Sequence, residues 1–149
     1  MDRIEREITV KAPVERVWTV LTEPEHIAQW FGDSASGTAE PGGELVLGWK
    51  EYGDFPVTIE RYEPPHAFAF RWVTGTQVES GTRPVPGNST LVEFTLAAQG
   101  DGTLLTVVES GFESLDMPAD QQLKNAEDNT DGWRQELDEL REYAESMAG

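Results

Sequence analysis

The chain has 149 residues, and its 28 acidic against 11 basic side chains give a formal charge of −17. A chain of this length suits one hydrophobic core, so we expect a single domain over residues 1–149. The negative charge repels nucleic-acid phosphates and anionic lipid headgroups, which excludes both as favoured partners. The sequence contains no cysteine, which excludes disulfides and thiolate chemistry.

We expect no secretory signal in the N-terminal segment. Its first ten residues alternate charged and apolar side chains and lack the apolar run of a secretory signal. No stretch approaches the roughly 18 apolar residues of a membrane span. We therefore expect a cytoplasmic protein of bacterial type that does not bind membranes.

The first elements predicted along the chain are one strand and two short helices. Residues 3–11 alternate charged and apolar side chains, which predicts a half-buried strand. Pro13 suits the first turn of a helix. Apolar residues follow it at helical spacing: Val14, Val17, Trp18 and Leu21. A second short helix is predicted over 24–31, with Trp30 and Phe31 directed inward.

The middle of the chain predicts strands separated by turn sequences. The predicted strands are 35–40, 44–50, 55–62, 66–74, 89–99 and 103–111. Gly100-Asp101-Gly102 predicts a hairpin turn, because glycine accepts the positive φ that such turns require. Closely spaced strands favour an antiparallel meander.

The C-terminal region predicts a long amphipathic helix that begins after Pro118. One apolar stripe contains Leu123, Thr130, Trp133, Leu137, Leu140, Ala144 and Met147. A sheet with one apolar face must cover that face, and this helix is the largest element available. The sequence therefore predicts an α+β fold, a curved antiparallel seven-stranded sheet wrapped around a long C-terminal helix.

Gly132 lies inside this helix beside Trp133. Glycine there costs about 1 kcal/mol relative to alanine, which calls for a reason. One interpretation is open cavity volume beside the indole, and another is close contact with the backbone of the sheet. A third is a bend that faces water next to Asp131. We favour cavity volume.

Aromatic residues gather on one face of the predicted sheet. Alternation in 66–74 places four side chains on that face: His66, Phe68, Phe70 and Trp72. Core packing explains any one of them, but together they are typical of a pocket lining.

Glu109 ends the last predicted strand. If Leu105 and Val107 face the helix, Glu109 does too, and its carboxylate could orient a ligand or act as a general base. The alternative is a strand-end position in contact with water or Arg71.

His26 and His66 are the only histidines and form no two-ligand pattern. We therefore expect no metal site, no cofactor and no catalytic residue that the sequence can assign.

Five stretches resemble the activator of heat-shock-protein-90 ATPase homologue family: 12–31, 57–72, 89–96, 104–113 and 129–140. This family belongs to the START-like (SRPBCC) superfamily of helix-grip folds, which also includes polyketide cyclases and birch-pollen-type allergens. The resemblance implies a helix-grip fold. It also matches the family's Asn-x-x-Gly-Trp signature to Asn129, Gly132 and Trp133, whereas the position of Glu109 often carries histidine.

We expect a binding protein for a small apolar or aromatic molecule, with its cavity between the sheet and the C-terminal helix. The candidate lining residues are Trp30, Trp49, Phe68, Phe70, Trp72, Phe94, Glu109, Asn129 and Trp133. Two alternatives stay open. One is a cyclase, dehydratase or hydrolase-like enzyme that uses Glu109 with Arg71 or His66, and the other is a chaperone-associated interaction module that uses the acidic helix. The oligomeric state is also open, with a homodimer as one option.

Overall fold

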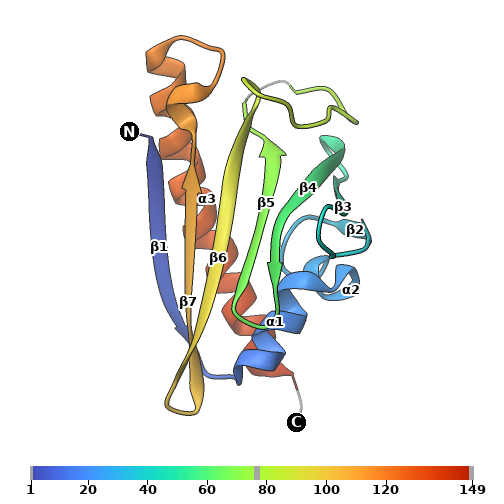
Figure 1. The fold of residues 1–149 in the computed structure, drawn as a ribbon, viewed down its shortest axis with the longest axis vertical. Helices are drawn as coiled ribbons and strands as arrows, with labels where there is room; N and C mark the ends of the chain where they lie inside the picture. The colour runs from blue at the N-terminus through green and yellow to red at the C-terminus, as the bar shows by residue number, and fades with distance from the viewer. Residues whose placement is uncertain (1, 76–77, 148–149) are drawn as a thin grey trace.

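The computed structural model describes residues 2–75 and 78–147. The chain forms an α+β fold in which one antiparallel sheet packs against a long C-terminal helix, as the sequence predicts (Figure 1). Its elements, in chain order, are β1 (Arg3–Val10), α1 (Val14–Thr22), α2 (Pro24–Ile27), β2 (Ser34–Gly37), β3 (Glu44–Trp49), β4 (Gly53–Glu63), β5 (Ala67–Val73), β6 (Ser89–Gln99), β7 (Gly102–Ser110), the short 3₁₀ helix η1 (Phe112–Ser114) and α3 (Ala119–Ser146).

The seven strands are ordered β1-β7-β6-β5-β4-β3-β2. Each strand from β2 to β7 pairs antiparallel with its sequence neighbour, and β1 joins the sheet beside β7. The meander predicted from the sequence is therefore confirmed. Gly100 and Asp101 connect β6 to β7, and the positive φ of Gly100, 60°, lets the chain reverse within two residues.

The helices lie on one face of the sheet. Figure 1 shows α3 running along this face behind β1, β7 and β6, with α1 and α2 beside its C-terminal end. α3 contacts β1, while α1 contacts both β6 and β7. This face is consequently the buried one, and its side chains meet those of α1 and α3 in the core.

The apolar stripe of α3 differs from the predicted one in its first turns. Trp133, Leu137, Leu140 and Ala144 are buried as expected, but Leu123 is 43% exposed. At 3.6 residues per turn Leu123 falls at the edge of the stripe, and the buried positions there belong to Asn125 and Ala126.

His66 also departs from the prediction. Strand β5 begins at Ala67, and the backbone N–H of His66 donates to Glu63 O at 2.8 Å in the turn before the strand. The side chain of His66 is exposed, so it is not buried with that of Phe68. Within the described residues no helix has the length and apolar character needed to cross a membrane.

Candidate functional site

Glu109 is fully buried at the end of β7. Strand alternation buries Thr103, Leu105, Val107 and Glu109, each no more than 1% exposed. The carboxylate therefore points to the helix side of the sheet, the inward orientation of the two that the sequence left open.

Four side chains donate hydrogen bonds to Glu109. The indole Nε1 of Trp133 donates to Oε1 at 2.8 Å, and that of Trp72 donates to Oε2 at 2.9 Å. The hydroxyl of Thr90 donates to Oε2 at 2.5 Å, and Asn129 Nδ2 lies 3.1 and 3.0 Å from the two oxygens. These contacts occupy the acceptor sites of the carboxylate. Glu109 therefore joins β5, β6 and α3 and leaves little capacity for a ligand.

A hydroxyl pair extends this network. Thr74 Oγ1 lies 2.6 Å from Thr90 Oγ1, and both residues are buried. Since the Thr90 hydroxyl donates to Glu109, the Thr74 hydroxyl is the donor in this pair. We therefore interpret Glu109 as a positioning group that fixes the two indoles.

The enzyme alternative requires Arg71 or His66 beside Glu109, and the structure does not bring them together. Arg71 follows the opposite face of β5 from Trp72, and its Nε lies 3.4 Å from Glu60 Oε1 on the exposed side. His66 Nδ1 lies 3.3 Å from Leu96 O. The predicted pairing of Glu109 with either side chain is therefore wrong.

Four of the candidate lining residues pack deep in the fold. Trp30, Phe68, Phe70 and Phe94 are each at most 5% exposed. Phe68 and Phe94 are stacked with ring centroids 6.4 Å apart, and Phe70 lies within 6.2 Å of both rings. The space among these and neighbouring residues is about 10 Å³, no more than the roughly 10–15 Å³ that one water needs. The aromatic rings thus fill the interior themselves.

Other candidates surround an open cavity, which we call the mouth cavity, of about 160 Å³. It is lined by Phe31, Trp49, Trp72, Asn129, Gly132, Trp133 and Glu136. A β-carbon on Gly132 would have no neighbouring atom within 4 Å, so a close contact with the sheet backbone is excluded. Gly132 is exposed at the edge of this cavity, so the structure fits both the cavity-volume and the water-facing interpretations.

Phe31 is central to the mouth cavity. Its ring is stacked on Trp133 with centroids 5.6 Å apart and lies 5.6 Å from Trp49 and 5.5 Å from Trp72. The sequence placed Phe31 inward without assigning it to the site.

Glu136 is the functional candidate that sequence reasoning missed. Its Oε2 is buried and has no hydrogen-bond partner among the described residues. Burial raises the pKa of Glu136 to about 7, and the neighbouring Glu139 adds to the rise through its charge and through a side-chain hydrogen bond. Glu136 follows Gly132 by about one helical turn, so helical spacing alone could have placed it beside that residue.

An apolar groove of about 490 Å³ adjoins the mouth cavity and shares Trp49 and Trp72 with it. We call it the strand groove. Its other lining residues are Leu47, Tyr52, Phe55, Val57, Val73, Gly75 and Val78. The two indoles of Trp49 and Trp72 are therefore walls of both spaces.

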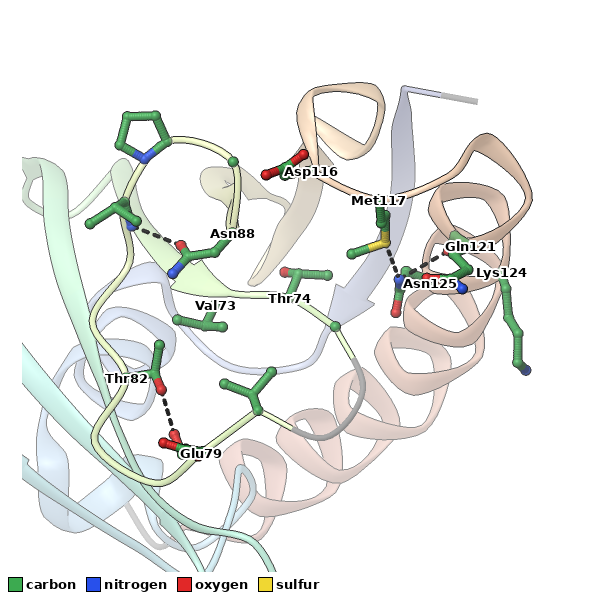
Figure 2. A pocket seen from close by; sticks show the side chains of 15 residues that line it. Val73, Thr74, Glu79, Thr82, Asn88, Asp116, Met117, Gln121, Lys124 and Asn125 are labelled. Carbon is green, nitrogen blue, oxygen red and sulfur yellow. Dashed lines mark hydrogen bonds between the residues drawn. The ribbon is translucent and has the colours of Figure 1, made fainter.

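A larger and more polar cavity of about 860 Å³ adjoins the other side of the strand groove and shares Val73, Gly75 and Val78 with it. Figure 2 shows it between the segment after β5, with Thr82 and Asn88, and the start of α3, with Gln121 and Asn125. Asn125 Nδ2 donates to Gln121 O at 2.9 Å and contacts Met117 Sδ at 3.0 Å. The polar groups of Asn125 and its neighbours bond to one another, so this cavity is a weaker candidate.

A curved antiparallel sheet gripping a C-terminal helix, with an aromatic site where they meet, defines a START-like protein of the helix-grip class. The sequence profile of the Activator of Hsp90 ATPase homolog 1-like protein family matches residues 11–145, and the chain belongs to this family. The comparison with curated proteins gave no match.

Several solved structures share the fold. Protein MLL2253 from Mesorhizobium loti is 21% identical, with a TM-score of 0.78 and 99% of each chain covered. DynU16, described as a protein in the dynemicin biosynthetic locus, is 26% identical with a TM-score of 0.76; the match covers 98% of this chain and 48% of that one. The Aha1 dimer from Colwellia psychrerythraea is 18% identical, with a TM-score of 0.75 and 100% of each chain covered.

Proposed function

We propose that the chain binds a small apolar or aromatic molecule at the mouth cavity and along the strand groove. The observation that carries this proposal is the difference in cavity volume between the interior and the mouth of the molecule. The interior aromatic residues leave about 10 Å³, whereas the mouth cavity leaves about 160 Å³ beside a groove of about 490 Å³. Concave sites with aromatic walls and few polar groups are typical of small-molecule binding.

The rigidity of two walls supports the proposal. Trp72 and Trp133 both donate to the buried carboxylate of Glu109, so their indoles are held in place before a ligand arrives. A lining that is already ordered loses less conformational entropy on binding. Glu109 thus contributes to binding indirectly, through the two indoles.

The similarity to DynU16 favours a ligand from small-molecule biosynthesis, since that protein is described as belonging to a biosynthetic locus. An enzyme on the same surface is less well supported. The polar groups named for it do not meet, because Arg71 pairs with Glu60 and His66 lies beside Leu96.

Gly132→Leu tests the proposal directly. The new side chain would enter open space and occupy the mouth cavity, and the helix would gain up to about 0.8 kcal/mol in propensity. We expect the melting temperature to stay level or rise. Binding of 1-naphthylmethanol, measured by titration calorimetry, should fall at least about tenfold.

Gln135→Leu is the matched control, since Gln135 is exposed on the same helix and does not line the mouth cavity. It should leave the affinity for 1-naphthylmethanol unchanged. If Gly132→Leu binds as well as wild type, the mouth cavity is not the site. If the folded wild-type protein binds no compound of a broad apolar panel, the proposed function is wrong.

A further inference from the structure

We propose that the ligand carries a protonated amino group, which binds Glu136 in the mouth cavity while its apolar body lies in the strand groove. This inference rests on the proposed function and specifies its ligand class. The distinguishing feature is a carboxylate oxygen without a donor, located in an aromatic cavity.

Glu136 supplies the hydrogen-bond acceptor. Its Oε2 is buried and lacks a hydrogen-bond partner within residues 2–75 and 78–147. A buried acceptor that leaves water without gaining a donor destabilises the protein. The N–H of a bound ammonium group would satisfy Oε2 and neutralise its charge at the same time.

Basic side chains of α3 do not fill this role. Lys124 pairs with Asp128 at 3.4 Å, Arg134 with Asp131 at 3.7 Å and Arg141 with Asp138 at 2.7 Å. Each of these pairs lies on the exposed side of the helix. The cation for Glu136 must therefore come from outside these pairs, and a ligand can supply it.

The walls of the mouth cavity favour a cation as well. Four of its lining residues, Phe31, Trp49, Trp72 and Trp133, are aromatic. An ammonium group beside aromatic rings gains cation–π attraction. The indole N–H groups of Trp72 and Trp133 already donate to Glu109, so they do not compete as donors for Glu136.

The same bonds select against anionic ligands. An anion needs N–H or O–H donors, and Asn129, Trp72 and Trp133 direct theirs to Glu109. The formal charge of −17 also lowers the local concentration of anions and raises that of cations. Lining chemistry and overall charge therefore favour the same ligand class.

The strand groove accommodates the rest of the ligand. It shares Trp49 and Trp72 with the mouth cavity, and aliphatic and aromatic side chains such as Leu47, Phe55 and Val57 line it. An apolar body attached to the amino group can extend past the two shared indoles into the groove. The site therefore fits an amine with an aromatic or aliphatic body.

The experiment compares two probes of nearly equal shape, 1-naphthylmethylamine and 1-naphthylmethanol, by titration calorimetry at pH 8. At this pH the amine is charged, and Glu136 is above its pKa of about 7. Wild-type protein should bind the amine about tenfold more tightly than the alcohol, since a charge-assisted hydrogen bond is stronger than a neutral one.

Glu136→Gln should remove most of this preference and leave the affinity for the alcohol unchanged. Glu142→Gln removes the same charge from an exposed position of α3 outside the cavity and should keep the preference. The ratio of the two affinities in the wild type is a test that needs no variant. Equal affinities in the wild type, or a preference that survives Glu136→Gln, would overturn the amine site while the proposed function stands. Binding of neither probe would contradict the proposed function itself.

Discussion

The interior and the mouth of the molecule belong to the same aromatic face, yet one is filled and the other is open. In the interior, Phe68 and Phe94 are direct partners in the register of β5 and β6, and their rings stack. At the mouth, α3 presents Gly132 and Glu136 to the rings of Trp49 and Trp72. An aromatic-rich sheet face therefore leaves space for a ligand only where the opposing helix leaves room.

The two regions also treat polar groups differently. Near the interior, the carboxylate of Glu109 is 0% exposed and accepts bonds from four side chains. At the mouth, Glu136 is only partly buried and keeps an oxygen without a partner. A satisfied buried carboxylate stabilises the structure, whereas one without a donor is available to a ligand.

The largest expected effect comes from opening the interior. Phe68 is 2% exposed, so Phe68→Ala should lower the free energy of unfolding by about 3–5 kcal/mol in urea titrations. Binding of 1-naphthylmethanol should persist in the variant, because Phe68 does not line the mouth cavity. Trp49→Ala is the matched change at the mouth. Because the Trp49 side chain is half-buried, its removal should lower the free energy of unfolding by roughly half as much. The affinity for 1-naphthylmethanol should fall at least about tenfold.

The opposite effects of the two variants on binding would place the ligand in the interior. If Phe68→Ala removed binding while Trp49→Ala kept it, the ligand would have to lie among the interior rings. The small space found there would then have to expand when the ligand binds.

The next effect concerns the carboxylate that holds the two indoles. Glu109→Gln puts an amide N–H₂ group among donors, so at least one indole N–H loses its acceptor. We expect a loss of about 2–4 kcal/mol in unfolding free energy and shifted indole N–H signals of Trp72 and Trp133 in NMR spectra. The affinities for both naphthyl probes should fall by the same factor, because the substitution acts on binding only by displacing the two indoles.

Glu93→Gln is the control on the neighbouring strand, on the face opposite the buried Phe94. It should change the stability by less than about 0.5 kcal/mol. If Glu109→Gln weakened the amine alone, Glu109 would contact the ligand directly, against the positioning role proposed for it.

The features that could be predicted from the sequence are those that depend on residues close together in the chain. Alternation in β7 predicted that Glu109 shares the face of Leu105 and Val107 but left open whether that face meets the helix, whereas turn residues predicted the β6–β7 hairpin from neighbours in the chain. The glycine inside a helix drew attention to position 132, which lies at the edge of the mouth cavity and is exposed. These features required no knowledge of packing.

The remaining features of the site depend on contacts between segments that are distant in the chain. Helical spacing connects Asn129 with Trp133 on α3, but no spacing rule connects this pair with Trp72 on β5, Thr90 on β6 and Glu109 on β7. Whether aromatic rings enclose a cavity or fill it depends on their volumes and tilts, which the residue pattern does not encode. Glu136 was missed because a glutamate in an acidic helix is usually a solvated residue.

The smallest expected effect is the pH response of the mouth. The folded state raises the pKa of Glu136 from 4.5 to about 7, so folding favours its protonated form. Its contribution to stability is therefore fully present below about pH 4.5 and is lost as the pH rises through about 7. Relative to Glu136→Gln, the wild type should lose unfolding free energy between pH 5 and pH 8. The carboxyl is partly exposed, so solvent screening keeps this loss below about 1 kcal/mol.

Urea titrations of both proteins at several pH values measure the difference, and titrating groups common to both cancel. A difference that stays constant, or that grows in favour of the wild type, would show that Glu136 is well solvated or paired. Saturating 1-naphthylmethylamine should offset the loss, because a bound ammonium stabilises the ionised carboxylate, and 1-naphthylmethanol should not.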